Sequence, residues 1–364
     1  MVLRGKRNPI PTAPPSLDTT LAPNATAVLS VRDLTVEYRT EAGPARAVRN
    51  VDLDIFPGEA VGLIGESGSG KSTLGLALLR LLVRTAHVSH GTAQFRQHNG
   101  EIVDLLAMSN AAMRRFRWAE MAMVFQSALN ALNPVLRVQD HFRDTARAHG
   151  KRDDRGTRER AAELLRMVQL DPERVLPAYP YELSGGMRQR VSIALSLLLS
   201  PQMVILDEPT TALDIITQRA IIDVVRDLRE RLGFTMLFIS HDLSLASELA
   251  DRVATMYAGK IVEIGPVRQV FHDPKHPYTI GLMNAVPPIA GTAFVELTAI
   301  PGSPPSLTSV PPGCAFHPRC PYATEVCRTD IPPLIVVGPK HAAACWHHDE
   351  VDRARAFKER VPHG

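Results

Sequence analysis

A glycine-rich segment, Gly65–Ser72 with the sequence GESGSGKS, has the residue types and spacing to bind phosphate. It fits the pattern G-x-x-x-x-G-K-[ST], and it lies between an apolar run at 60–64 and a helical pattern that begins at about Ser72. Glycine lets the backbone approach a phosphate closely, so successive N–H groups can point at the anion from the positive end of the following helix. Lys71 can then reach the β- and γ-phosphates, and the Ser72 hydroxyl is placed for Mg²⁺. The predicted nucleotide contacts are Gly65, Ser67, Gly68, Ser69, Gly70, Lys71, Ser72 and Thr73.

Two adjacent carboxylates, Asp207 and Glu208, end a second apolar run at 203–206. A buried strand would deliver Asp207 to the coordination shell of Mg²⁺, and Glu208 could polarise the water that attacks the γ-phosphate. The pair therefore predicts hydrolysis of a nucleotide rather than phosphoryl transfer to a hydroxyl.

A second helix start carries Ser184, Gly185 and Gly186, within the segment Leu183–Arg190. Unpaired backbone N–H groups, the helix dipole and the serine hydroxyl can again bind an anion. Because the chain has two such helix starts and only one loop lysine, we interpret the second as a site for a partner's nucleotide.

The elements that position these groups follow from the spacing of apolar residues. From residue 28 onward, short apolar runs alternate with helical patterns, which is typical of a mostly parallel sheet covered by helices, an α/β fold. The predicted strands are 61–65, 121–125, 203–207, 235–240 and 253–257. Apolar residues at i, i+3, i+4 and i+7 predict amphipathic helices around 161–168 and 221–232, the second ended by Gly233.

Composition divides the chain into three parts. Residues 1–28 are rich in Pro, Thr, Ala and Asn without periodicity, which predicts a disordered tail. Residues 29–265 hold the strands and motifs described above. Residues 266–364 include a proline-crowded stretch at 286–340, which predicts a separate, small and loop-rich extension.

Charge and hydropathy exclude several classes of protein. The net charge of +3 and the isoelectric point of about 8.7 are too weakly basic to imply nucleic acid or an anionic membrane surface. The longest apolar stretches, 76–83 and 191–199, are too short or too interrupted to span a bilayer, and the N-terminus lacks the apolar part of a secretory signal. We therefore expect a cytoplasmic protein that is soluble or peripheral to a membrane.

Over about residues 29–265, the chain resembles the nucleotide-binding subunit of ATP-binding cassette (ABC) transporters. The ordered motifs that carry the resemblance are Gly65–Ser72, Gln126, Leu183–Arg190, Val204–Pro209, Thr211–Asp214 and Ser240–Asp242. The resemblance implies a P-loop ABC ATPase domain with a helical subdomain at about 128–190 and a head-to-tail dimer. It implies that Gln126 contacts Mg²⁺ and the attacking water, His241 the γ-phosphate, and Asp214 the facing subunit. Tyr38 resembles the aromatic residue that stacks on adenine, although the segment 40–46 lengthens its distance from the loop.

A narrower resemblance, to ATPase subunits of bacterial oligopeptide, dipeptide and nickel importers, comes from residues 126–134, 271–279 and 313–321. It implies an ATPase that powers a multi-subunit importer at the cytoplasmic face of the cell membrane, with peptides (dipeptides or oligopeptides) as the expected substrate class. The implied partners are a second, related ATPase subunit, two transmembrane permeases that contact the surface between Gln126 and His141, and an extracytoplasmic substrate-binding protein. The alternative is a soluble ABC ATPase acting on nucleic acid or ribosomes. Such chains typically carry two cassettes or a long coiled-coil insertion, and the sequence has neither.

All four cysteines lie near the C-terminus, at Cys314, Cys320, Cys327 and Cys345. Their confinement predicts one shared centre, and a cytoplasmic location disfavours disulfides. Four thiolates suit either an iron–sulfur cluster or tetrahedral zinc, and the spacing lacks the C-x₂-C pair common at structural zinc sites. Members of the resembled importer group with this quartet can hold a [4Fe–4S] cluster, which we prefer. Zinc remains the alternative, with His317, His341, His347 and His348 as further candidate ligands.

Overall fold

The computed structural model describes residues 27–126, 131–211, 213–285 and 299–351. The tail predicted for residues 1–28 lies almost wholly outside the described residues. So do residues 127–130, at the start of the predicted helical subdomain, and residues 286–298, the first part of the proline-crowded stretch at 286–340.

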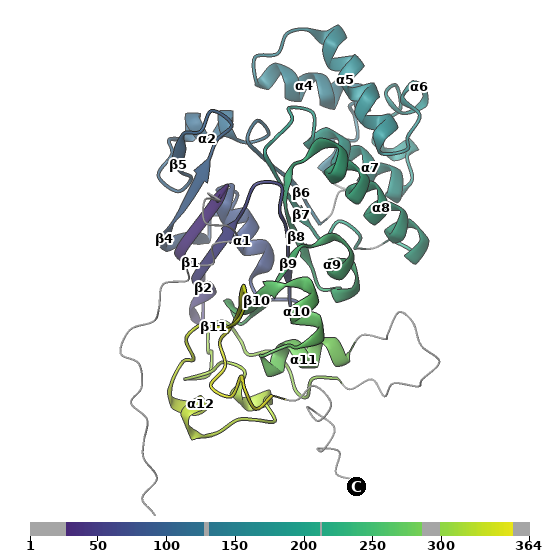
Figure 1. The fold of residues 1–364 in the computed structure, drawn as a ribbon. Coiled ribbons are helices and arrows are strands. Elements are labelled where there is room, and N and C mark those ends of the chain that lie inside the picture. Colours follow the sequence, from purple (N-terminus) through teal and green to yellow (C-terminus); the bar gives the residue numbers. More distant parts are fainter. Residues whose placement is uncertain (1–26, 127–130, 212, 286–298, 352–364) are drawn as a thin grey trace, which may run out of the picture.

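An eight-stranded sheet with the order β11-β12-β10-β9-β3-β8-β7-β6 forms the centre of the molecule (Figure 1). Strands β6, β7, β8, β3 and β9 run parallel, whereas β10, β12 and β11 are antiparallel to their neighbours. The parallel strands coincide with the five predicted ones, so the predicted α/β fold is confirmed. The bounds are β3 Ala60–Ile64, β6 Met121–Val124, β7 Met203–Asp207, β8 Thr235–Ser240, β9 Arg252–Tyr257, β10 Lys260–Pro266, β11 Ile335–Gly338 and β12 His341–Ala343.

A second sheet, with the antiparallel order β2-β1-β4-β5, is a feature that the sequence patterns do not predict. Its strands are β1 Leu29–Thr40, β2 Gly43–Ile55, β4 Ala86–Arg96 and β5 Ile102–Asp104. Irregularities in the pairing of β1 with β2 and β4 interrupt the alternation of apolar and polar residues. The segment 40–46 is the β1–β2 hairpin, in which Thr40 lies opposite Gly43.

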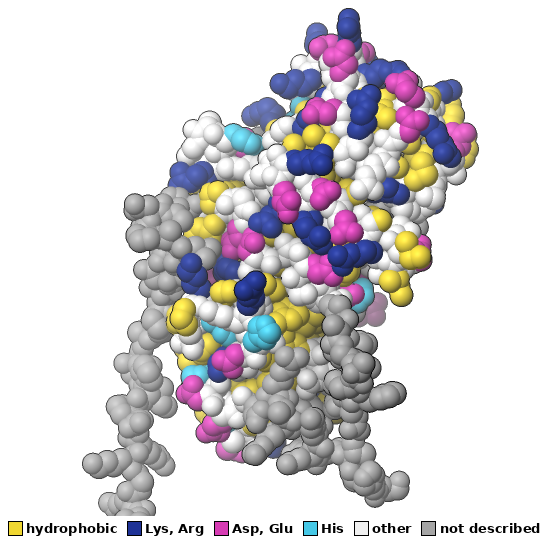
Figure 2. All heavy atoms as spheres, turned by 45° about the vertical axis from the view of Figure 1, so that its right-hand side comes forward, with side chains coloured by type: hydrophobic (Ala, Val, Ile, Leu, Met, Phe, Trp, Pro, Cys, Tyr) yellow, Lys and Arg dark blue, Asp and Glu magenta, His cyan; other side chains and the backbone are white. Residues whose placement is uncertain are grey.

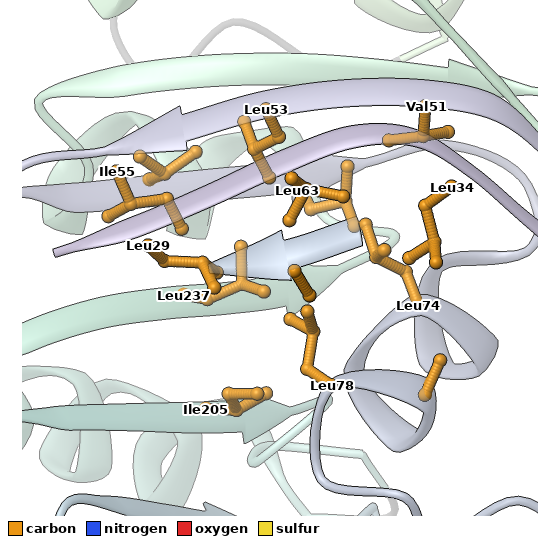
Figure 3. Packing of buried hydrophobic residues seen from close by; sticks show 14 of the residues in the cluster. Leu29, Leu34, Val51, Leu53, Ile55, Leu63, Leu74, Leu78, Ile205 and Leu237 are labelled. Carbon is orange, nitrogen blue, oxygen red and sulfur yellow. The ribbon is translucent and has the colours of Figure 1, made fainter. Parts of the chain in front are cut away.

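Helix α1 (Lys71–Leu78) lies between the two sheets, and Figure 3 shows its apolar contacts. Leu74 and Leu78 are fully buried in one cluster with side chains from both sheets, among them Leu29, Leu34, Val51, Leu53, Ile55, Leu63, Ile205 and Leu237. Because burial on two sides fixes this helix, the loop that precedes it has a defined position at the carboxyl edge of the central sheet. Helix α2 (Asn110–Phe116) follows the antiparallel sheet.

A group of helices forms the upper part of Figure 1: α4 Val138–Ala148, α5 Asp154–Met167, α6 Pro172–Val175, η1 Pro180–Glu182, α7 Gly185–Ser196 and α8 Ile215–Leu232. Both predicted amphipathic helices are confirmed. Helix α5 buries Ala161, Leu164 and Leu165, and α8 buries Ile221, Val224, Val225 and Leu228. Gly233 ends α8 with a left-handed φ of 69°. Helix α9 (Leu243–Leu249) packs on β3 and β8.

The C-terminal region is part of the same body. It comprises α10 Val267–His272, α11 Pro277–Asn284, η2 His317–Arg319 and α12 Glu325–Thr329, together with β11 and β12. Strand β10 continues past Gly265, and β12 pairs with it, with Glu263 opposite Ala343. Tyr278 and Phe316 share a buried cluster with Ile64 and Tyr257 of the central sheet. Shared backbone pairing and a shared core thus join the predicted C-terminal extension to the ATPase part.

The surface over the helices in the upper part of Figure 2 carries basic and acidic side chains side by side. Several are ion pairs within or between α4 and α5, such as Arg155–Glu159 and Arg160–Glu163. This mixture is that of a solvated helical surface rather than a basic patch. In the described part of the chain, no helix combines the length and apolarity that a membrane span requires.

Candidate active site

The loop Gly65–Ser72 leaves the carboxyl end of β3 and enters α1. Gly65, Gly68 and Gly70 have φ values of 154°, 78° and 106°. A Cβ on Gly65 would collide with the Met256 carbonyl oxygen, and one on Gly70 with the Ala47 carbonyl oxygen, whereas one on Gly68 would meet nothing within 4 Å. Glycine is thus needed at two positions for close approach to neighbouring backbone, and at the third for conformation alone.

Lys71 begins α1 and is 4% exposed. Its Nζ donates hydrogen bonds to the carbonyl oxygens of Gly65 (2.7 Å) and Glu66 (2.9 Å) and to Ser69 Oγ (3.3 Å). Burial lowers its pKa, and the nearby carboxylates of Glu208, Asp207 and Glu66 oppose this shift. These hydrogen bonds hold the Lys71 ammonium at the loop, where it can attract an anionic phosphate.

The side chains of Ser72, which follows Lys71, and Asp207 are in contact. Ser72 Oγ donates to Asp207 Oδ1 over 2.9 Å, which joins α1 to the end of β7. Asp207 is 4% exposed, and burial raises its pKa; repulsion by Glu208 adds to the rise, while the Ser72 hydrogen bond and Lys71 oppose it. A hydroxyl and a carboxylate are hard oxygen donors of the kind that Mg²⁺ prefers, so these residues fit a magnesium ion in chemistry.

The Glu208 carboxylate is the meeting point of residues that follow three neighbouring strands. Gln126 Nε2 donates to Glu208 Oε2 over 2.7 Å, and Thr211 Oγ1 donates to the same oxygen over 2.9 Å. His241 Nδ1 lies 3.3 Å from Glu208 Oε1. Glu208 itself has a φ of 45°, an uncommon value for a non-glycine residue, and its N–H donates to the Ile239 carbonyl. The three predicted catalytic residues are thus brought together.

Tyr38 lies on β1, and its hydroxyl is 3.2 Å from Thr73 Oγ1 on α1. The β1–β2 hairpin accommodates the extra residues after Tyr38, so they do not separate it from the loop helix. Tyr38 is half-buried, with part of its surface available to a ligand.

The second predicted anion site forms a group of its own. Ser184 precedes α7 and accepts a hydrogen bond from Met187 N, while Gly186 lies so close to Thr217 that a Cβ would be 2.5 Å from Thr217 Cγ2. Asp214 precedes α8 and accepts from the N–H (2.9 Å) and hydroxyl (2.7 Å) of Thr217. Thr217 therefore joins the starts of α7 and α8. In the residues that the structure describes, no hydrogen bond or ion pair links Ser184, Gly185 or Gly186 to the Gly65–Ser72 loop.

The four cysteines, Cys314, Cys320, Cys327 and Cys345, line one small cavity together with His276, His317 and His347. Burial raises the pKa of both Cys320 and Cys345 to about 12, and repulsion by neighbouring thiolates adds to the rise. Across the described ranges, no group of three or more His, Cys, Asp or Glu side chains is arranged to hold a metal ion. The thiols thus converge on one place, whereas their metal stays a prediction.

Sequence reasoning gave no role to three residues that the structure connects to the site: Thr211, Glu66 and Arg319. Thr211 lies in a motif beside Glu208, which is a signal that could have found it. The Arg319 guanidinium contacts the Glu66 carboxylate, but 253 positions separate the two residues, and no local pattern indicates the pairing.

A glycine-rich loop between a strand and a helix, together with a nearby strand of the same sheet that runs into Asp-Glu, defines the class of P-loop nucleoside triphosphatases. Residues 48–211 match the model of the ABC transporter family, and residues 262–327 match that of the oligopeptide/dipeptide transporter C-terminal region.

Curated relatives extend over nearly the whole chain. The dipeptide transport ATP-binding protein DppD of Caldanaerobacter subterraneus is 42% identical over 89% of this chain and 98% of its own length. The oligopeptide transport ATP-binding protein OppD of Bacillus subtilis is 39% identical over 92% of this chain and 94% of its own. A solved dimer of the ATP-binding cassette MJ0796 with ADP and Pi is 28% identical, with a TM-score of 0.58, over 66% of this chain and 99% of that one.

The chain therefore belongs to the ABC transporter family of ATPases, in the group with the oligopeptide/dipeptide transporter C-terminal region. The identification made from the sequence motifs is confirmed.

Proposed function

We propose that this chain binds and hydrolyses MgATP to drive the import of peptides through a membrane transporter. The relatives DppD and OppD, named for dipeptide and oligopeptide transport, support peptides as the substrate class. The observation that carries the catalytic part is the convergence of Gln126 and Thr211 on the Glu208 carboxylate.

Phosphate binding is assigned to the loop and its lysine. The Lys71 ammonium, with the N–H groups of Gly68, Ser69 and Gly70, offsets the charge of the β- and γ-phosphates, while Tyr38 stacks on the adenine. Ser72, Asp207 and Gln126 would hold the Mg²⁺, which supplies positive charge at the phosphate oxygens when bound.

Hydrolysis is assigned to Glu208. Hydrogen bonds from Gln126 and Thr211 fix its Oε2, which leaves Oε1 to orient the attacking water and to accept its proton. His241, whose side chain is 60% exposed, is placed beside Oε1 to contact the γ-phosphate. Orientation by fixed hydrogen bonds reduces the rearrangement needed at the moment of reaction.

A second nucleotide-binding subunit completes the site. Ser184, Gly185 and Gly186 would bind the nucleotide that the facing chain's loop holds, and Asp214 would contact that chain. Ile215 and Ile216 support such an interface, because they follow Asp214 and are 83% and 82% exposed. The facing chain is proposed to be a related ATPase subunit rather than a copy.

The membrane partners are two permease subunits, served by an extracytoplasmic substrate-binding protein, and no nucleic acid is involved. We assign the permease contact to the surface between Gln126 and His141, of which residues 127–130 lie outside the description. In the described part of this surface, Val135 is 76% exposed, as a docking residue would be. We accordingly propose that the chain is a peripheral subunit at the cytoplasmic face of the membrane.

The cysteine centre is proposed to hold a [4Fe–4S] cluster, with zinc as the alternative. Its four sulfur donors, which line one cavity, fit either group in chemistry. Cys314, Cys320, Cys327 and Cys345 would be the ligands. A bound centre would stabilise the thiolates, whose formation burial otherwise opposes, and would cross-link this part of the fold.

Affinity purification of the tagged chain from membranes tests this assignment. We expect permease subunits and a related ATPase to co-purify, and the complex in vesicles to import a labelled peptide only with MgATP. Vesicles with Glu208→Gln are the matched control and should import none. Co-purification of RNA or ribosomes in place of permeases would contradict the proposal and support the soluble ABC ATPase.

A further inference from the structure

Glu66, the second residue of the phosphate loop, contacts the rest of the protein through three different groups. Its carbonyl oxygen accepts the 2.9 Å hydrogen bond from Lys71 Nζ. Its N–H donates to the Tyr278 hydroxyl over 2.7 Å. Its carboxylate forms an ion pair with Arg319. The last two partners lie in the C-terminal region, so this region contacts the second residue of the loop directly.

The ion pair between Glu66 and Arg319 has two parallel hydrogen bonds. Arg319 Nη1 donates to Glu66 Oε2 over 2.7 Å, and Nη2 donates to Oε1 over 2.8 Å. Such bidentate geometry fixes the orientation of a carboxylate as well as its position. The Arg319 side chain is 6% exposed and that of Glu66 is 24% exposed, so water screens the pair only in part.

Arg319 is itself held in place. Its Nε donates to the Pro301 carbonyl over 2.9 Å, and Nη1 also reaches the Tyr257 hydroxyl at 3.3 Å. The guanidinium carbon lies 5.8 Å from the ring centroids of both Tyr257 and Phe316. A guanidinium fixed on so many sides can position its partner rather than follow it.

We propose that Arg319, acting through Glu66, is a positioning residue for the phosphate loop, so that the C-terminal region sets the affinity of the active site for MgATP. The inference rests on the proposed binding of phosphate by the loop and Lys71. Glu66 is negatively charged in a loop that must receive a polyanion, and Arg319 offsets that charge. Without Arg319, the carboxylate would repel the phosphates and the loop would lose its fixed orientation.

A double-mutant cycle in the assembled transporter tests the inference, with KM and kcat measured against MgATP. Arg319→Gln should raise KM for ATP about tenfold, equivalent to about 1.4 kcal/mol, with kcat changed less than about twofold. Glu66→Gln with Arg319→Gln should bring KM back to within about threefold of the original, because the unpaired charge is gone. Glu66→Gln alone completes the cycle and should raise KM no more than the double variant does, because it loses the fixed orientation but leaves no unpaired negative charge at the loop.

The conservative variant Arg319→Lys keeps the charge and loses the bidentate geometry, so its KM should lie between those of the unmodified protein and Arg319→Gln. A matched control is Arg252→Gln. It breaks another buried ion pair, Arg252–Glu59 at 3.0 Å, which lies at the opposite end of β9 from the loop. This variant should lower the thermal midpoint and leave KM for ATP unchanged.

Two results would overturn the inference: an unchanged KM in Arg319→Gln, or a double variant impaired as much as Arg319→Gln. The second would mean that Arg319 contributes only to the fold. Lys71→Ala tests the underlying assignment separately. If that variant still bound MgATP normally, the proposed phosphate site itself would be wrong, whatever Arg319 does.

Discussion

Gln126 Nε2 and Glu208 Oε2 are 2.7 Å apart, in a hydrogen bond between residues that follow the neighbouring parallel strands β6 and β7. Thr211 donates to the same carboxylate oxygen, and His241 lies beside the other. The two oxygens of Glu208 therefore have different surroundings, one bound by protein donors and one directed to a histidine that is largely exposed. Such a difference suits a catalytic base, because the protein holds one oxygen in place and the other can contact the attacking water.

Glu208→Gln should bind MgATP normally and hydrolyse it about two to four orders of magnitude more slowly, because an amide cannot accept the proton of the attacking water. The measurement is the steady-state rate of phosphate release from the assembled complex, together with the nucleotide retained after gel filtration. Thr211→Val is the graded companion: it removes one donor to Oε2 and should cost about tenfold. Near-normal turnover in Glu208→Gln would remove this residue from catalysis.

Asp207→Asn should raise the thermal midpoint of the nucleotide-free protein at neutral pH. Burial raises the pKa of Asp207 in the folded state, so the native protein binds more protons than the unfolded chain between the ordinary and the raised pKa, and stability falls as pH increases through this window. The gain in Asp207→Asn should therefore shrink as pH falls through this window and be lost below the ordinary carboxyl range. The measurement is the midpoint across pH.

The same variant should lose most of the stabilisation by MgATP, which for an intact site is about 2.7 kcal/mol at about 100 times Kd. A midpoint at or below that of the unmodified protein at pH 7 would contradict the stability prediction. It would mean that Lys71 and the Ser72 hydrogen bond outweigh the cost of burying the carboxylate.

The parallel part of the sheet and the loop were predictable from sequence because their signals are local. The run before Asp207 is continuous and apolar, as in a strand buried on both faces, and Gly65–Ser72 combines special backbone needs with a lysine. The antiparallel sheet was not predictable, since register shifts in β1 disturb the alternation that would identify it.

The position of the C-terminal region was missed for a different reason. Its strand β12 contributes three residues and pairs with β10, far away in sequence, so it depends on tertiary contacts rather than on a local pattern. The ion pair between Arg319 and Glu66 likewise joins residues that are far apart in sequence, so no local pattern indicates it. Composition identified prolines and cysteines in this region, but it could not indicate which surface they cover.

Ser184→Arg should damage the nucleotide site completed in the facing subunit while leaving MgATP binding at this chain's own loop within about twofold. The reason is that Ser184 begins α7, next to Thr217 and Asp214, and forms no described hydrogen bond with the Lys71 loop. A photoreactive ATP analogue, with mass spectrometry of the labelled peptides, measures both sites. Crosslinking of Ser184 to a nucleotide held by Lys71 of the same chain would rule out the dimer.

Cys320→Ser should disrupt the cysteine centre. Anaerobically purified protein is expected to be brown with about four irons per chain, and the variant to be colourless with a lower thermal midpoint. The exposed residue Val336 on β11 offers a matched control, since Val336→Ser should keep colour and iron. Cys320 follows Arg319 directly, so Cys320→Ser is also expected to raise KM for ATP. A C-terminal extension with an independent core would leave KM unchanged.

A measurement of about one zinc and no iron per chain, in protein never exposed to air, would mean that the shared site holds zinc in place of the cluster. Protein that contains neither metal would have four thiols without a centre, and would contradict both assignments.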